Sequence, residues 1–256
     1  PYKVKVADAY YFSLKSGDSA KLMTSDLTSK GTKSTPFTFE SLGSMLSLGD
    51  SLIFAADQGK GSELYSFSPN GKDPKPRLIK DLVADGSSSP QELTVLGEQV
   101  FFSASDGKRR ELYVFDGKNK SVSTVAAAHK ITVPADPVHL TVVGNKLFFS
   151  AGEAKEVKKG KKTRKVYQRR YFMLDTEKPG KIHGFPFFDR HTNQKHPLVD
   201  GTKLYFKIHE GPERYEILCI DTAAAQPKVE VIGDGSEGFS DCLTIIGEKM
   251  YFRGFD

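Results

Sequence analysis

The chain contains no tryptophan and only two cysteines, Cys219 and Cys242, among its 256 residues. Two thiols can form at most one bridge, which excludes a disulfide-stapled scaffold for a protein of this size. The apolar runs are also short, and none approaches the roughly 20 residues that a membrane-spanning helix needs. An ordinary apolar core must therefore hold the fold together. Because the chain begins at Pro1, we expect a processed form or a fragment of a longer protein.

Amphipathic helical periodicity is missing as well. The alanine runs at 126–128 and 223–225 are too short to nucleate a helix. Runs of β-branched and aromatic residues are instead separated by turn residues along the whole chain. This pattern predicts a nearly all-β protein.

A short phrase recurs six times along the chain, and its copies at 93–102, 140–149 and 243–252 are nearly identical. In every copy a phenylalanine follows a glycine or an alanine by five residues. The six phenylalanines are Phe12, Phe54, Phe102, Phe149, Phe206 and Phe252. They are separated by 42, 48, 47, 57 and 46 residues. A period of this regularity indicates a repeat architecture.

Each phrase consists of two apolar runs joined at the glycine, which is the sequence form of a β-hairpin. A third run follows, with Glu-Leu-Tyr at 63–65 and 111–113, and a fourth run closes the unit. Four short strands repeating at this spacing are typical of a β-propeller, whereas a sandwich has no reason to repeat one hairpin at one period. We therefore predict an all-β fold, a β-propeller of four-stranded antiparallel blades. Six blades are preferred, and five are the alternative.

The predicted units form a single β-propeller domain over residues 1–256. They cover approximately residues 1–40, 41–83, 90–127, 138–184, 196–232 and 240–256. The sixth unit stops after its second strand. Either the parent chain continues beyond Asp256, or the N-terminal region rearranges to complete this blade.

Three motifs accompany the repeat: Glu111-Leu-Tyr-Val-Phe-Asp-Gly117, the turn Ser105-Asp-Gly107 and the interblade segment Asp85-Gly-Ser-Ser-Ser-Pro90. They resemble the ELWxxDGT repeats, a hyalin-repeat-like family of β-propeller repeat proteins, with Tyr65 and Tyr113 where the consensus has tryptophan. The resemblance implies extracellular or cell-surface proteins, mostly without catalysis, and nothing else in the chain indicates a compartment. WD40 and kelch repeats fit less well, because the chain has no Trp-Asp pair and no paired glycines.

The net charge of +5 is concentrated in one segment. Residues 153–170 hold nine Lys or Arg and two Glu, while the rest of the chain has 28 basic and 30 acidic residues. The segment is inserted between the second and third runs of the fourth unit, and we interpret it as a basic hairpin. Such a density attracts polyanions, an acidic protein surface or an anionic membrane. The candidate binding residues are Lys155, Lys158, Lys159, Lys161, Lys162, Arg164, Lys165, Arg169 and Arg170.

A solvated hairpin without a partner is the alternative interpretation of this segment. Sequence-specific nucleic-acid binding is not expected, because Tyr167 alone offers a stacking ring nearby. No membrane span is expected either.

Other motifs have simpler explanations, and we expect no cofactor and no metal. Residues 233–238 match GxGxxG, but a predicted strand hairpin follows where a dinucleotide site needs a helix. The cluster of His183, Asp189, His191 and His196 lacks the usual metal-ligand spacing. Cys219 and Cys242 are expected to be buried thiols, and whether they are bridged stays open.

The preferred hypothesis is a non-catalytic binding or scaffold module that recognises a protein or glycan partner through its propeller faces. The basic hairpin favours an anionic partner. The alternative is a propeller glycoside hydrolase or lyase acting at the central channel, which needs two converging carboxylates. The predicted innermost strands supply only Asp200, and the loop residues Asp57, Asp106 and Glu210 are the other candidates. Turn geometry explains hairpin carboxylates more simply.

Overall fold

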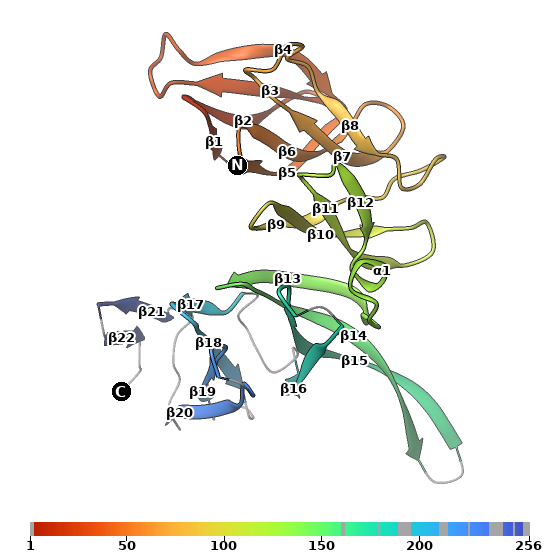
Figure 1. Ribbon diagram of the computed structural model, residues 1–256, viewed down its shortest axis with the longest axis vertical. Coiled ribbons are helices and arrows are strands. Elements are labelled where there is room, and N and C mark those ends of the chain that lie inside the picture. Colours follow the sequence, from red (N-terminus) through yellow and green to blue (C-terminus); the bar gives the residue numbers. More distant parts are fainter. Residues whose placement is uncertain are drawn as a thin grey trace. The chain divides into compact units, whose positions relative to one another are not determined.

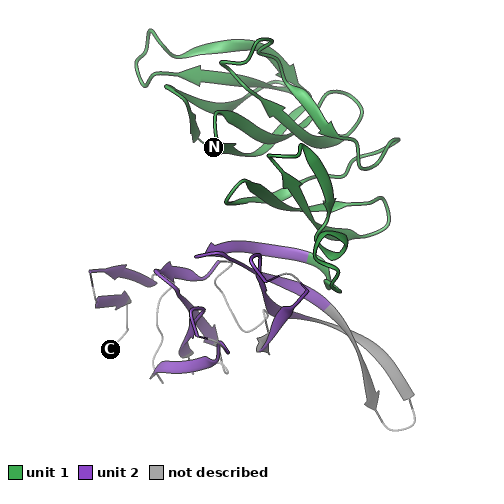
Figure 2. Ribbon diagram, viewed as in Figure 1, with its two compact units in different colours: residues 1–136 green, residues 137–256 purple. Residues whose placement is uncertain are grey.

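The computed structural model describes residues 3–159, 162–178, 180–188, 196–209, 215–224, 226–235, 243–247 and 249–252. Apart from one short helix, every element within these ranges is a β-strand (Figure 1). No helix in the described part is long and apolar enough to cross a bilayer. The chain divides into two compact units, residues 1–136 and 137–256, and each is described by itself (Figure 2).

The first unit contains three four-stranded antiparallel sheets, numbered here as blades 1 to 3. Blade 1 contains β1 (Lys3–Val6), β2 (Ala9–Ser16), β3 (Ser19–Ser25) and β4 (Lys33–Phe39). Blade 2 contains β5 (Ser41–Leu48), β6 (Ser51–Asp57), β7 (Ser62–Phe67) and β8 (Arg77–Lys80). Blade 3 contains β9 (Gln91–Leu96), β10 (Gln99–Ser105), β11 (Arg110–Asp116) and β12 (Ser121–Thr124).

The second unit holds two more four-stranded sheets and a two-stranded hairpin. Blade 4 contains β13 (Ala135–Val143), β14 (Lys146–Lys159), β15 (Lys162–Asp175) and β16 (Ile182–Phe188). Blade 5 contains β17 (Leu198–Asp200), β18 (Lys203–His209), β19 (Tyr215–Asp221) and β20 (Val229–Gly235). The hairpin consists of β21 (Leu243–Ile246) and β22 (Lys249–Phe252). The prediction of an all-β fold built from four-stranded antiparallel blades is confirmed.

The glycine of the repeated phrase begins the two-residue turn between the first and second strands of each sheet. The turn residues have positive φ angles: Ala7 51°, Gly49 54°, Gly97 62°, Gly144 56°, Gly201 56° and Gly247 62°. A positive φ at the first central position is the geometry of a type II′ hairpin turn, which favours glycine there. Blade 1 adopts the same geometry with an alanine.

In blades 2, 3 and 4 the phenylalanine of the repeated phrase pairs with an aromatic residue of the third strand, whereas Met23 and Leu218 stand at this position in blades 1 and 5. Phe54 stacks on Tyr65 with ring centroids 6.0 Å apart, and Phe102 stacks on Tyr113 at 5.6 Å. Both pairs are also direct Cα partners across their strands. Phe149 and Phe172 form the equivalent pair in blade 4 at 5.9 Å. Each stack stabilises its sheet by about 0.5–1.5 kcal/mol beyond the burial of area.

The second strand of blade 2 is buried on both faces. Leu52, Ile53, Phe54, Ala55 and Ala56 are all 2% exposed or less. Phe54 packs with Val6 and Leu22 of blade 1, whereas Ile53 on the opposite face packs with Phe102 of blade 3. Alternate side chains thus cover two neighbours, because successive residues of a strand point to opposite faces. This double burial is the packing that a propeller blade requires.

The second unit has the same kind of core between blades 4 and 5. Phe148 and Tyr171 of blade 4 stack at 5.2 Å, and Phe206 of blade 5 lies 5.1 Å from the Tyr171 ring. All three side chains are fully buried. The repeated phenylalanine of blade 5 therefore faces the preceding blade, as it does in blades 2 and 3.

Glu63 ties blade 2 to the segment that leads into blade 3. Its carboxylate is 4% exposed and accepts hydrogen bonds from Ser88 N at 2.9 Å, Ser88 Oγ at 2.6 Å and Leu82 N at 3.3 Å. The carbonyl of Ser88 in turn accepts a hydrogen bond from Ser105 N at 2.8 Å. Burial raises the pKa of Glu63, while the hydrogen bonds from Ser88 and Leu82 act in the opposite direction.

One local expectation is wrong. The alanines at 126–128 lie in a single-turn helix, α1 (Val125–His129), where the sequence indicated none. Thr124 caps its first turn by accepting a hydrogen bond from Ala127 N at 3.2 Å, and Lys130 ends it with φ 54°. Caps at both ends, together with the buried Val125, offset the nucleation penalty that disfavours so short a helix alone.

Exchanging the turn residues tests the equivalence of the repeats. We expect Gly97→Ala to lower the free energy of unfolding by about 1–2 kcal/mol, because an alanine is strained at positive φ. An added Cβ would contact nothing within 4 Å there, so strain is the whole effect. Ala7→Gly should raise stability by up to about 1 kcal/mol, since it relieves the same strain. Urea denaturation measures the unfolding free energy of both variants. Equal effects of the same sign would contradict the conclusion that the two turn positions share the same strained geometry.

The Glu63 hydrogen bonds predict a pH-dependent difference between the native chain and Glu63→Gln. The variant should be less stable by roughly 1–3 kcal/mol, because an amide cannot accept from every donor around it. The raised pKa means that the folded chain retains a proton that the unfolded chain has released above the ordinary value of 4.5. The stability advantage of the native chain should therefore fall as the pH rises from about 4.5 towards 7. Urea titrations at each pH measure it, and an advantage that grows with pH would refute the raised pKa.

Candidate binding surface

The basic segment 153–170 lies in a long two-stranded ribbon. Strands β14 and β15 have 14 residues each and pair continuously from Lys146 opposite Asp175 to Lys159 opposite Lys162. The pairing of β16 with β15 reaches only to Arg170, opposite Phe188. Beyond Arg170, the ribbon therefore continues without β16 beside it.

The structure assigns most of the candidate cations to the paired backbone of this ribbon. Lys155, Lys158 and Lys159 belong to β14, and Lys162, Arg164, Lys165, Arg169 and Arg170 belong to β15. Lys161 lies outside the described residues, as do the side chains of residues 153–168. The register places Lys159 opposite Lys162 and Glu156 opposite Lys165.

Arg170 has a structural contact. Its guanidinium donates from Nη2 and Nε to the carbonyl oxygen of Phe185, at 3.1 and 3.3 Å. These hydrogen bonds join β15 to β16 at the base of the ribbon. Holding the blade together therefore occupies part of the donor capacity of Arg170.

The glycine-rich motif begins inside a strand. Gly233 and Gly235 belong to β20 and pair with Ile217 and Tyr215 of β19. Residues 236–240 lie outside the described ranges, and the next described element is the strand β21. A helix N-terminus that could hold a pyrophosphate is not present among the described residues of this region.

The histidines do not form a described metal site. His183 lies in β16 with its ring 4.7 Å from that of Phe185, whereas Asp189 and His191 fall outside the described residues. The ring of His196 lies 5.7 Å from that of His139, a contact that the sequence did not indicate. Within the described part of the chain, no group of three or more potential ligands comes together.

Two of the candidate carboxylates shape turns. Asp57 Oδ1 accepts hydrogen bonds from Gly59 N at 2.8 Å and from Gly61 N at 3.0 Å. Asp106 Oδ1 accepts from the backbone N–H groups of residues 108 and 109, each at 2.8 Å, and these bonds lower its pKa. Asp200 ends β17, and Glu210 is outside the described ranges.

Cys219 is a free thiol, 7% exposed, in β19. Burial raises its pKa, which disfavours the thiolate that a nucleophile needs. Cys242 belongs to the residues that the structure does not describe.

Two grooves between neighbouring blades were not indicated by the sequence. The first lies between blades 2 and 3 and has a volume of about 360 Å³. The second lies between blades 4 and 5 and has a volume of about 340 Å³, with Lys146, Lys178, Lys181 and Asp175 in its wall. Both reach the lower limit of typical ligand pockets, roughly 300–1,000 Å³. A single sequence gave no signal for either groove, because each groove combines residues from two repeats.

Solved structures similar to this chain are β-propellers. The β-propeller domain of the Trilobed protease from Pyrococcus furiosus matches with a TM-score of 0.58 at 11% identity, covering 100% of this chain and 77% of that chain. TolB from Acinetobacter baumannii matches with a TM-score of 0.50 at 14% identity, covering 89% and 55%. The tricorn protease matches with a TM-score of 0.57 at 13% identity, covering 85% and 21%.

The chain thus spans about half the length of TolB and about a fifth of the tricorn protease chain. No protein-family model matches the chain, and a search of curated proteins finds no significant match. At these identities the likeness shows the fold alone, and the fold is a β-propeller.

Replacing Arg170 tests whether its hydrogen bonds to the Phe185 carbonyl stabilise the blade. We expect Arg170→Met to lower the free energy of unfolding by roughly 1–3 kcal/mol, because the Phe185 carbonyl loses its charged donor. Thermal and urea denaturation measure this loss. Arg164→Met, which removes the same charge farther along the ribbon, is the matched control. Equal stability of the two variants would show that the Arg170 contact contributes nothing.

Proposed function

We propose that the protein is a non-catalytic binding module whose blades form a scaffold and whose basic ribbon, residues 153–170, binds an anionic partner. The observation that carries the proposal is the ribbon itself, with nine cations along 18 residues of sequence. Its strands continue past their pairing with β16, so its length exceeds what a turn between two blade strands requires.

The spacing of the charges supports a polyanion as the partner. Residues 158–165 carry six positive charges and no acid. Of these residues, 158–159 and 162–165 belong to the ends of two paired antiparallel strands, β14 and β15, which concentrates their charge at one end of the ribbon, where a sulfated or phosphorylated polymer could contact it. Binding would release counterions, so affinity would fall steeply with salt.

The absence of catalysis and the location at the cell surface rest on observations other than the ribbon. Asp57 and Asp106 are engaged in turn hydrogen bonds, which favours a structural role over an acid–base role. The resemblance to ELWxxDGT repeats favours an extracellular or cell-surface protein. Turnover of a glycoside by the purified chain would contradict the non-catalytic assignment.

Replacing the ribbon tests the proposal. We expect the native chain to be retained on a heparin column and to elute with rising salt. A variant with a Gly-Ser turn in place of residues 155–165 should elute at a much lower salt concentration, because it has lost a net charge of +6.

The matched control removes six charges elsewhere, by replacing the exposed lysines with glutamine. These are Lys30, Lys33, Lys60, Lys72, Lys75 and Lys108. Its retention should fall far less than that of the ribbon variant, because the remaining charge is still concentrated in one segment. Equal retention of the two variants would refute the ribbon as the binding site.

A further inference from the structure

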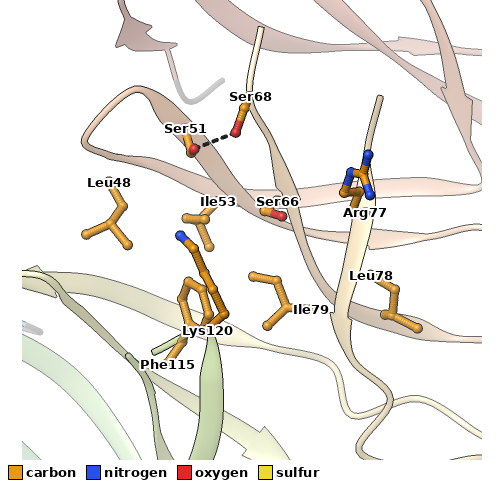
Figure 3. Close-up of a pocket in the computed structure, with 10 residues that line it drawn as sticks. All are labelled: Leu48, Ser51, Ile53, Ser66, Ser68, Arg77, Leu78, Ile79, Phe115 and Lys120. Atoms are coloured by element: carbon orange, nitrogen blue, oxygen red, sulfur yellow. Dashed lines mark hydrogen bonds between the residues drawn. The ribbon is translucent and has the colours of Figure 1, made fainter. Parts of the chain in front are cut away.

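The groove between blades 2 and 3 has a defined floor and a cationic rim (Figure 3). Ile53 and Phe115 form the floor and are 1% and 2% exposed. Ser66 lies in the wall on β7. Arg77 on β8 and Lys120, in the turn just before β12, lie at the rim. The residues belong to two blades of the same compact unit.

The groove lies where aliphatic side chains take the place of the aromatic side chains found between blades 1 and 2. Between blades 1 and 2, Tyr11 and Phe37 both pack edge-on against Phe67, at 5.7 and 5.5 Å. Phe115 is the counterpart of Phe67 in the repeat, but the residues that face it are Ile53 and Ile79. Two isoleucines occupy less space than a tyrosine and a phenylalanine, so the interface stays open.

The groove combines apolar and hydroxyl groups. Ser51 Oγ and Ser68 Oγ share a hydrogen bond of 2.7 Å along one wall (Figure 3). Leu78 extends the apolar surface outwards and is 46% exposed. Because Phe115 is almost completely covered, it offers no open ring face on which a sugar could stack. These walls fit an aliphatic or aromatic side chain flanked by groups that hydrogen-bond.

The charge of the groove is positive. Lys120 Nζ lies 5.9 Å from the centroid of the Phe115 ring, over the floor (Figure 3). Arg77 Nη2 donates to Asp73 Oδ2 at 2.9 Å, which orients this guanidinium but leaves its other donors. Among the described residues that line the groove, none is a carboxylate. A ligand with a negative charge beside its apolar group is therefore complementary.

We propose that this groove binds an extended acidic protein segment, in which a carboxylate lies next to a large apolar side chain. The apolar side chain would contact Leu48, Leu78 and Ile79 above this floor, and the carboxylate would pair with Lys120 and Arg77. The inference rests on the proposed binding role of the protein but not on the basic ribbon. It identifies a second site and a partner class, an acidic protein surface.

The second unit supports this reading of the groove as a feature of the repeat. Lys146 begins the second strand of blade 4, as Ser51 does in blade 2, and Lys146 lines the groove between blades 4 and 5. Its Nζ donates to Thr222 O of the next blade at 2.5 Å. Each unit thus has a groove between neighbouring blades with cationic side chains in its wall.

The test is fluorescence anisotropy with a fluorescein-labelled peptide, Gly-Asp-Leu-Asp-Phe-Asp-Gly, titrated with the full chain. One matched peptide has asparagine for each aspartate, and another has serine for leucine and phenylalanine. We expect the acidic apolar peptide to bind at least about tenfold more tightly than either. Equal binding of the three peptides, or no binding of any, would overturn the proposal.

Two variants locate the bound peptide. Ile79→Phe fills the groove with the residue type that blade 1 carries as Phe37, and Lys120→Glu reverses the rim charge. Each should weaken binding about tenfold or more. The control Lys108→Glu, on the hairpin at the other end of β11, should leave affinity within about twofold. Thermal denaturation checks folding, and if Ile79→Phe does not fold, the exposed Lys120→Glu decides the outcome.

The ribbon variant separates this inference from the proposed function. Peptide binding that survives the Gly-Ser replacement but is lost in Lys120→Glu supports the groove. Binding that is lost with the ribbon and unchanged in Ile79→Phe and Lys120→Glu places the peptide on the ribbon, and this overturns the groove while supporting the proposed function. A sulfated disaccharide that binds in place of every peptide and is lost in Ile79→Phe identifies a glycan site and also overturns the proposal.

Discussion

The burial of central strands on both faces is the constraint on which the architecture depends. In blade 2 the side chains from Leu52 to Ala56 are all withdrawn from solvent, although successive residues point in opposite directions. One sheet cannot cover both faces of its own strands, so each blade needs a neighbour on either side. The aromatic stacks, such as Phe54 on Tyr65, give each face a rigid surface to present to that neighbour.

The same constraint explains where a groove can form. Between blades 1 and 2, aromatic rings occupy the space, because Tyr11 and Phe37 both pack against Phe67. The space between blades 2 and 3 stays open where Ile53 and Ile79 face Phe115. A repeat fold can therefore acquire a ligand site by reducing side-chain size at one interface, without any change in backbone topology.

One position of the repeat carries a charged side chain that hydrogen-bonds to the backbone of a neighbouring segment, and this side chain is acidic in blade 2 and basic in blade 4. Glu63 stands opposite Ala56, and Arg170 stands opposite Ala151, two residues beyond the repeated phenylalanine in each blade. Glu63 accepts hydrogen bonds from the backbone of the segment that follows its blade, whereas Arg170 donates to a backbone carbonyl of its own fourth strand. Backbone offers both donors and acceptors, so the buried acid Glu63 and the half-buried base Arg170 can perform the same structural task. This is why Arg170, although basic, contributes to the blade as well as to the charge of the ribbon.

The periodic features of the protein were readable from its residues alone. Hairpins, strand number per blade and the positive-φ turns at Gly97 and Gly144 depend on neighbours in the chain, so local patterns were sufficient to predict them. Contacts between distant residues were not readable, including Glu63 with Ser88, His139 with His196, and the groove over Phe115. The helix at Val125–His129 was missed because its caps and burial outweigh an unfavourable local propensity. Sequence determined which segments become strands, since alternation and turns are local. Tertiary structure decided which faces of the blades meet and which interface keeps a groove. The space left between two blades depends on the side chains that both repeats place there, and a single repeat does not show it.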